Sequence, residues 1–496
     1  MKNKVSLIIL TFIILGGLWF RFVGIEKNLS FWNDESHAAI YSRGVAQTGL
    51  PVDTQGRGRG IYQVGLYYVT GASFKLFGIS QTAGRLPSIV VGTLLIGIVY
   101  LVSRKVSTSE LVALTSAFLV SFSQIQLAWS TQLRPYIWLE LFSILVFYFA
   151  IQSLNSKKKI FDRQFISAAI LGSVSYLFHP IGFFNIIFLF FIFAYKSIIA
   201  KKIWYLLALI PLAVLTYLLI YFSIGQDIEE VIKFVTQIHT DTLHYRVFLR
   251  ANYDWLIFGT FVGVIGLFQR NKQYAFVLSG FIFIIFFLAI FKINASYVRY
   301  CLPAFPLLYI LFSFGIEKIT KHFVSLTKNE KLFVPFFLLI FAILIYFPIQ
   351  KSKILLNPRY FYTINGDMRE NPIVDYAIAF DKIRKMISGK KSVILMDAWN
   401  DRIPWYLPDQ EYIFLTKNEK YIDPTFNEKM VGTIAGFESE KKRYQSGVVL
   451  VENWESLTPP DLQKHIRDTL TRKFDVENLP YNEADKWSIS IYTWGL

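Results

Sequence analysis

Long apolar runs separated by short polar connections fill the first 350 residues of this sequence. A helix that crosses a lipid bilayer needs about 20 mainly apolar residues, and most of these runs approach that length. Because no small-residue cleavage site precedes Trp19 and Arg21, we expect the first run to stay in the protein as a helix. The pattern predicts about eleven transmembrane helices, at residues 5–22, 86–102, 111–127, 135–154, 165–178, 183–200, 204–224, 255–268, 274–291, 302–316 and 333–349.

The pattern changes after residue 350, where charged and turn-forming residues become frequent and apolar runs shrink to the length of strands. The chain therefore divides into a transmembrane domain, residues 1–350, and a soluble α/β domain, residues 351–496. In the soluble domain we expect strands at 392–396, 411–415, 447–451 and 487–493, and helices at 375–387 and 461–474.

The positively charged residues agree with this arrangement of spans and connections. Arg104 with Lys105, and Lys201 with Lys202, lie in connections on the same predicted side as Lys2. Cytoplasmic loops of membrane proteins retain Lys and Arg, so we expect a cytoplasmic N-terminus. An odd number of spans then makes the C-terminal domain extracytoplasmic, in a multi-pass protein of the plasma or inner membrane. These loops also account for the formal net charge of +16, so no nucleic-acid partner is needed to explain it.

Composition agrees with a membrane protein. Apolar residues make up 54% of the chain and aromatic residues 17%, which excludes the disordered and collagen-like classes and exceeds the needs of one soluble core. The single cysteine, Cys301, excludes an internal disulfide framework and a cysteine metal cluster. We expect Cys301 to be a small buried residue.

The first outer loop, residues 24–84, is long for a connection between spans, and long loops on rigid scaffolds often carry function. We expect two helical stretches in it, one that starts at Asn33 and one over residues 61–77. Ala38 and Tyr41 fall on one face of the first stretch, a spacing suited to lying on the membrane surface.

Two adjacent acids, Asp34 and Glu35, stand at the start of the first stretch. Acids are favoured in the first helical turn, where they can cap free amides or complement the helix dipole, so a purely structural role is one interpretation. The other is a catalytic carboxylate. Adjacent helical residues point roughly 100° apart, so the pair cannot jointly flank one bond as the two acids of a glycosidase do.

Several short motifs occur in an order that resembles a known family. They are Phe31-Trp32-Asn33-Asp34-Glu35, Gly49-Leu50-Pro51, Leu76-Phe77-Gly78, Gly84-Arg85-Leu86-Pro87-Ser88, Ser130 to Tyr136, Phe178-His179-Pro180, and Arg299 to Ala304. All are predicted to lie on the outer face. Over roughly residues 5–350 the chain is similar to glycosyltransferases of the GT-C fold that use polyprenyl-phosphate sugars, above all the aminoarabinose transferases and protein O-mannosyltransferases.

The resemblance implies roles for individual residues. Asp34 would be the base that deprotonates an acceptor hydroxyl, with Glu35 as a weaker second that orients the acceptor. Where many relatives carry a Lys-Pro-Pro-Leu-Tyr segment, this chain has Arg57 to Tyr62, so an arginine would replace the lysine. The implied substrate-binding residues are Arg57, Arg59, Tyr62, Arg134, Tyr136, His179 and Arg299, of which the arginines would hold the lipid phosphate.

Each of these residues also has a simpler interpretation. Outer arginines can extend toward lipid headgroups, and His179 can cap a helix end. Tyr62 and Trp129 can stack on a sugar ring or belong to an interfacial aromatic belt. Glu140 lies about one turn inside the fourth predicted span, close enough to the outer end to face water.

Oligosaccharyltransferases of the same fold class bind metal through acids in the second outer loop, whereas Ala128 to Arg134 contains none. The resemblance therefore implies a metal-independent reaction without a cofactor.

The sequence thus predicts a membrane glycosyltransferase of the cell envelope. Its donor would be a polyprenyl-monophosphate sugar and its acceptor a hydroxyl of a glycan, lipid or protein at the extracytoplasmic face. One rival is a transporter or lipid flippase, which would place paired ionisable residues at the bilayer midplane and show an internal repeat. Another is a glycan polymerase or ligase that uses a diphosphate-linked lipid. The identity of the donor would separate these enzymes.

Overall fold

The structure, a computed structural model, divides into two compact units. The helical unit contains residues 1–25, 60–66 and 85–370, and the sheet unit contains residues 26–59, 67–84 and 371–496. Within these units the structure describes residues 3–23, 25, 30–54, 56–58, 63–154, 161–208, 236–295, 297–359, 375–389, 392–396, 403–417, 429–453, 456–476 and 488–496.

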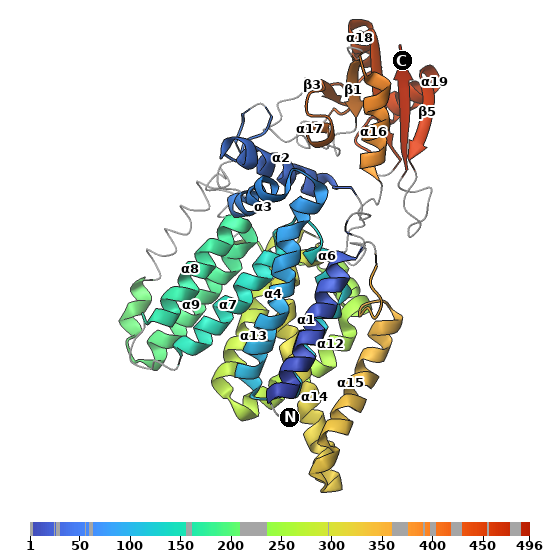
Figure 1. Cartoon of the computed structure of the whole chain (residues 1–496). Helices are drawn as coiled ribbons and strands as arrows, with labels where there is room; N and C mark the ends of the chain where they lie inside the picture. The colour runs from blue at the N-terminus through green and yellow to red at the C-terminus, as the bar shows by residue number, and fades with distance from the viewer. Residues whose placement is uncertain are drawn as a thin grey trace. The chain divides into compact units, whose positions relative to one another are not determined.

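Helices form nearly all of the helical unit (Figure 1). Each predicted span within the described residues falls on a helix, while span 204–224 lies largely outside them. Among the described residues eight helices are long and apolar enough to cross a membrane, which confirms a multi-pass membrane protein. The helices are α1 (Asn3–Phe22), α4 (Gln81–Ser107), α5 (Glu110–Phe122), α6 (Gln124–Ser130), α7 (Tyr136–Ser153), α8 (Arg163–Phe178), η2 (Pro180–Gly182), α9 (Phe183–Ile199), η3 (Ile203–Ala208), α12 (Leu243–Arg270), α13 (Lys272–Phe287), η4 (Leu288–Ile293), η5 (Val298–Ala304), α14 (Phe305–Thr327), η6 (Glu330–Leu332) and α15 (Phe333–Gln350).

One predicted span, residues 111–127, is broken into α5 and α6. Ser123 at the break has an extended backbone and forms a bridge with Ile354. The amide of Gln124 donates to the carbonyl of Lys353 at 2.9 Å. Hydropathy cannot predict this break, because it depends on pairing with a segment more than 200 residues later in the chain.

Small residues let α12 and α14 approach closely. An added Cβ on Gly263 would lie 1.9 Å from the backbone oxygen of Leu311, and one on Gly315 would lie 2.0 Å from the oxygen of Gly259. Glycines spaced by four residues permit such backbone contact between membrane helices, which pack by van der Waals contact and not by the hydrophobic effect.

Replacing Gly263 with alanine should therefore destabilise the helical unit. The new methyl group would clash with backbone atoms, which cannot rotate away as a side chain can, and overpacking of this kind costs about 1–3 kcal/mol. Thermal unfolding of the purified protein in detergent measures the effect. Gly97→Ala is the matched control, because its Cβ would have only the Ile14 Cδ1 near it, at 3.9 Å. Equal unfolding temperatures for the two variants would contradict close packing at Gly263.

The C-terminal part of the sheet unit is coloured orange to red in Figure 1. Its described residues form a six-stranded sheet with strand order β3-β2-β1-β4-β6-β5. The first four strands in this order run parallel, and β6 and β5 are antiparallel to their neighbours. The predicted C-terminal α/β domain is thus confirmed. Its elements are α16 (Tyr376–Ile387), β1 (Ser392–Met396), α17 (Ile403–Tyr406), β2 (Tyr412–Phe414), β3 (Lys429–Met430), α18 (Ile434–Arg443), β4 (Ser446–Glu452), α19 (Pro460–Thr469), β5 (Thr471–Val476) and β6 (Ile489–Trp494).

Alternating side chains of the strands bury both faces of the sheet. On β1, Ile394 and Met396 pack in the cluster that includes Phe380 of α16. Val393 and Leu395 pack in the opposite cluster, with residues of α18 and α19. Period-two burial on a sheet covered by helices on both sides explains why β1 and the middle of β4 are apolar.

The predicted helix 461–474 is only partly correct. Pro460 at the first helical position starts α19 as expected, but the helix ends at Thr469 and the chain continues as the edge strand β5. Phe474 pairs with Ile491 of β6 and packs against the core, so contact with a distant strand overrides the local helical pattern.

The two predicted helices of the first outer loop are α2 (Asn33–Thr48) and α3 (Val64–Phe77). Both Ala38 and Tyr41 are fully buried, and the Tyr41 ring stacks on Tyr67 of α3 at 5.3 Å. This face therefore packs inside the protein and does not lie on a membrane surface.

Helix α2 is also attached to the C-terminal part of the sheet unit. The guanidinium of Arg43 donates to the Pro404 carbonyl at 2.6 Å, and its Cζ lies 5.5 Å from the Trp405 ring centroid. Trp405 in turn contacts Phe31, just before α2, and Phe74 of α3. The outer-loop helices and the C-terminal sheet thus form one packed unit, which the sequence pattern treats as parts of two domains.

Candidate active site

Three helix ends of the helical unit bring four of the predicted site residues together. Arg134 and Tyr136 lie at the start of α7, His179 joins α8 to η2, and Arg299 is in η5. With Trp129, Tyr297 and Tyr300 they form one connected group, called here the arginine–tyrosine cluster.

Tyr136 lies at the centre of this cluster. Its ring centroid is 4.8 Å from that of Trp129, 5.5 Å from His179 and 6.2 Å from Tyr300. Tyr136 is the first residue of α7, so its fully buried side chain is fixed by the helix and by α6 before it.

Two guanidinium groups share the ring of Tyr136. The Cζ of Arg134 lies 5.5 Å from its centroid, and the Cζ of Arg299 lies 5.6 Å from it. Arg299 also lies 3.7 Å from the Tyr297 centroid and within 6 Å of Trp129 and Tyr300. Rings attract a guanidinium through their negative faces, so Arg299 is held as a cation by four aromatic residues.

The cluster is buried. Arg134, His179 and Arg299 are each 6% exposed and Trp129 is 1% exposed. An arginine that extends to lipid headgroups keeps its charged end outside the protein, so that interpretation is wrong for Arg134 and Arg299. The aromatic-belt interpretation is likewise wrong for Trp129, whose ring packs edge-on against Tyr136.

His179 caps a helix and contacts the cluster. Its Nδ1 accepts a hydrogen bond from the amide of Ile181 at 3.1 Å, as expected for a residue at the start of η2. Because Nδ1 is an acceptor, Nε2 carries the proton in the neutral ring. The same ring lies 6.2 Å from Tyr300, so the local and the functional interpretations do not exclude each other.

A buried arginine of α1 fixes the segment that precedes the cluster. Arg21 is 1% exposed, and its guanidinium donates to Ser130 Oγ at 2.8 Å and to the carbonyls of Gly17 and Ser121. An added Cβ on Gly92 of α4 would lie 3.0 Å from Arg21 Nε, so α4 packs directly against this contact. Nothing in the hydropathy pattern indicates this role for Arg21.

Glu140 does not face water as predicted. It is fully buried in α7, and its Oε2 accepts a hydrogen bond from Gln126 Nε2 at 2.7 Å. The prediction used only the distance along the helix from its outer end, whereas α6 covers this side of α7.

The other predicted site residues are in the sheet unit or outside the described residues. Asp34 and Glu35 occupy the first turn of α2, where Asp34 is half-buried and Glu35 is fully buried. Trp32 is the N-cap of this helix, so neither acid occupies the capping position. Arg57 pairs with Asp53 at 2.9 Å, which fixes a tight turn within the loop. Arg59 and Tyr62 lie outside the described residues.

Sequence reasoning missed two members of the cluster, Tyr297 and Tyr300. Their signal was the spacing around Arg299, since two tyrosines within two residues of a cation at a helix end can surround it. No group of three or more His, Cys, Asp or Glu gathers in the described part of the chain. Metal independence stays a prediction.

A family model and solved structures resemble this chain. The model for dolichyl-phosphate-mannose-protein mannosyltransferase matches residues 64–221, which include α7 and the first half of the cluster. None of the curated protein sequences matches.

Two solved structures share the fold over most of the chain. The apo structure of ArnT from Cupriavidus metallidurans is 12% identical, with a TM-score of 0.60 and 97% of each chain covered. Archaeal oligosaccharyltransferase AglB from Archaeoglobus fulgidus is 13% identical, with a TM-score of 0.57, 90% of this chain and 69% of that chain covered. The predicted resemblance is confirmed by the family model and by these structures, and the chain has the GT-C fold.

Proposed function

We propose that this enzyme transfers a sugar from a polyprenyl-monophosphate donor to an acceptor hydroxyl on the extracytoplasmic face. The arginine–tyrosine cluster carries this proposal. Two buried guanidinium groups around one tyrosine repel each other, and a phosphate between them relieves that repulsion while it accepts their N–H donors. Solved structures of the same fold contain undecaprenyl phosphate in ArnT and dolichol-phosphate in AglB.

Charge and connectivity support the extracytoplasmic face as the side of the reaction. The cluster lies where α7 begins, at the opposite end of the bundle from the Lys- and Arg-rich connections such as Arg104-Lys105. Positive loops of membrane proteins stay in the cytoplasm, which supports an extracytoplasmic cluster and a cytoplasmic N-terminus.

The reaction needs a base and a site for negative charge. The Asp34 carboxylate takes the acceptor proton while the acceptor oxygen attacks the anomeric carbon. The bond from that carbon to the phosphate oxygen breaks, and polyprenyl phosphate leaves with the electron pair. Attack opposite the leaving group inverts the anomeric configuration. The phosphate is stabilised by Arg134 and Arg299, so the proposal requires neither a general acid nor a metal.

Asp34 and Glu35 share the first turn of helix α2. Glu35 is fully buried beside Asp34 in the same helical turn, which suits an orienting role better than proton transfer.

The test uses the purified full chain in detergent with polyprenyl-phosphate mannose as the first donor probe. Release of polyprenyl monophosphate with transfer or hydrolysis of the sugar is expected, and the rate should be unchanged by a chelator. Turnover of a polyprenyl-diphosphate sugar alone would support a polymerase or ligase instead. Movement of the intact lipid across vesicles without cleavage of the sugar–phosphate bond would support a flippase.

A further inference from the structure

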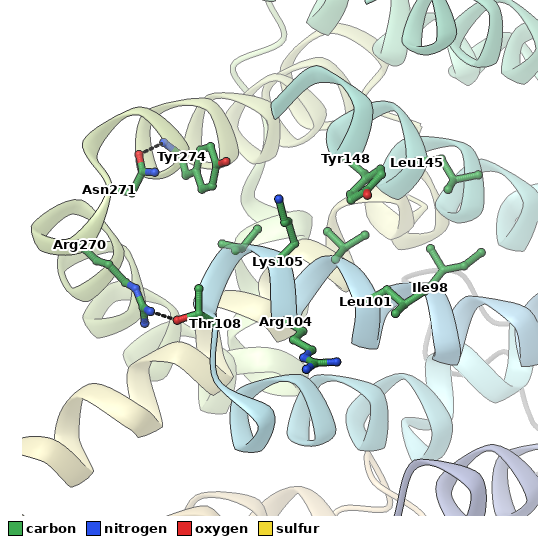
Figure 2. A pocket seen from close by; sticks show the side chains of 12 residues that line it. Ile98, Leu101, Arg104, Lys105, Thr108, Leu145, Tyr148, Arg270, Asn271 and Tyr274 are labelled. Atoms are coloured by element: carbon green, nitrogen blue, oxygen red, sulfur yellow. Dashed lines mark hydrogen bonds between the residues drawn. The ribbon is translucent and has the colours of Figure 1, made fainter. Parts of the chain in front are cut away.

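The helical unit contains a cavity of about 860 Å³ at its other end, away from the arginine–tyrosine cluster (Figure 2). It lies between the C-terminal parts of α4 and α7 and the connection from α12 to α13. Tyr148 in its wall is 12 residues beyond Tyr136, or about 18 Å along α7. The cavity and the cluster are therefore separate sites.

The cavity is apolar along one wall and basic along the other. Ile98 and Leu101 of α4 and Leu145 of α7 form the apolar side, while Arg104, Lys105 and Arg270 supply three cations. None of the described residues that line it is an acid. Figure 2 shows Lys105 extending from α4 toward the space between Tyr148 of α7 and Tyr274 of α13.

Three hydrogen-bond donors line that space. Lys105 is exposed, and Tyr148 and Tyr274 are half-buried. Within the described part of the chain no residue accepts a hydrogen bond from the Lys105 ammonium or from either tyrosine hydroxyl. A ligand with negative oxygens in the cavity would offer acceptors to these donors, because an ammonium and a hydroxyl both donate to the oxygens of a phosphate.

The two arginines have acidic partners outside the wall, but charge around the cavity is still positive. Arg104 pairs with Glu110 at 2.8 Å. Arg270 lies 4.0 Å from Glu317 and contacts Thr108, while Glu317 also pairs with Lys321. A guanidinium has five N–H donors, so one carboxylate leaves donors for a further anion.

We propose that this cavity binds the phosphate of an anionic membrane lipid, with the acyl chains along the apolar wall. Basic pockets between transmembrane helices at the positively charged side recognise such headgroups. A free phosphate would use the three donors but would leave the apolar wall of Ile98, Leu101 and Leu145 in water. The proposal is independent of the sugar-transfer reaction and needs no donor at the cluster.

Native mass spectrometry of the purified full chain tests the proposal. Phosphatidylglycerol should bind more tightly than phosphatidylcholine with the same acyl chains. Lys105→Gln should weaken phosphatidylglycerol binding roughly fivefold, because one Lys contact to an anionic lipid contributes about 1 kcal/mol. The double variant Tyr148→Phe, Tyr274→Phe should weaken it as well, and neither change should affect phosphatidylcholine.

Lys331→Gln is the matched control, since Lys331 is an exposed cation of η6 that does not line the cavity. It should bind both lipids as wild type does. Competition by inorganic phosphate at equal concentration would show a site for a free anion and overturn the lipid assignment. Equal binding of the two lipids, or equal loss in the Lys105 and Lys331 variants, would show only a positively charged surface and would also overturn it.

Discussion

Asp34→Asn should lower the turnover number for sugar transfer by at least about a hundredfold, because an amide cannot take the proton of the acceptor hydroxyl. Asparagine has nearly the same shape as aspartate, so the first turn of α2 is expected to keep its structure. The KM for the lipid donor should stay close to wild type, since Asp34 is assigned to the acceptor and not to the phosphate. Initial rates at saturating donor and acceptor measure the change.

Asp461→Asn is the control for this variant. Asp461 occupies the first turn of α19, so its substitution removes the same helix-dipole interaction, worth about 0.3–1 kcal/mol, without removing a proposed base. If Asp34 only stabilises its helix, both variants will unfold slightly earlier and both will keep full activity. Wild-type turnover in Asp34→Asn would therefore eliminate it as the base.

The membrane architecture could be predicted because each span carries its own signal. A run such as 333–349 must be helical and apolar whatever surrounds it, since lipid offers no partner to backbone amides and carbonyls. Parallel strands such as β1 could be predicted in the same way, because burial on both faces requires an unbroken apolar sequence.

Features that depend on tertiary partners could not be predicted in the same way. The break at Ser123 needs the segment around Ile354, and strand β5 needs β6 beside it. The burial of Glu140 needs Gln126 of another helix. In each case the local sequence is compatible with the predicted structure, and a contact far along the chain selects a different one.

In the candidate site, too, some features could be predicted from the sequence and others depend on tertiary contacts. Arg134, His179 and Arg299 could be predicted because their motifs resemble those of a known family, and the structure places all three at helix ends. Their shared contacts with Tyr136 could not, because cation–π geometry depends on how helices rotate against each other. The role of Arg21 was missed for the same reason.

Arg299→Gln should raise the KM for the lipid donor at least about thirtyfold, the equivalent of losing about 2 kcal/mol of a buried charge-assisted contact. Glutamine removes the cation that Tyr297 and Tyr136 surround, while its amide still fills part of the space. Arg250→Gln is the control, because Arg250 is an exposed arginine of α12 outside the cluster. An unchanged donor KM in Arg299→Gln would remove Arg299 from the phosphate site.

Arg299→Lys separates phosphate binding from a purely structural role. A lysine keeps the positive charge among the four rings. If Arg299 only stabilises the cluster, Arg299→Lys should therefore recover the unfolding temperature that Arg299→Gln loses. It cannot replace the planar fork that binds two phosphate oxygens, so donor KM should remain several times above wild type even in a stable variant. If Arg299→Lys has both the unfolding temperature and the donor KM of the wild type, Arg299 serves packing. If only the unfolding temperature returns to the wild-type value and the donor KM stays raised, Arg299 binds the lipid phosphate.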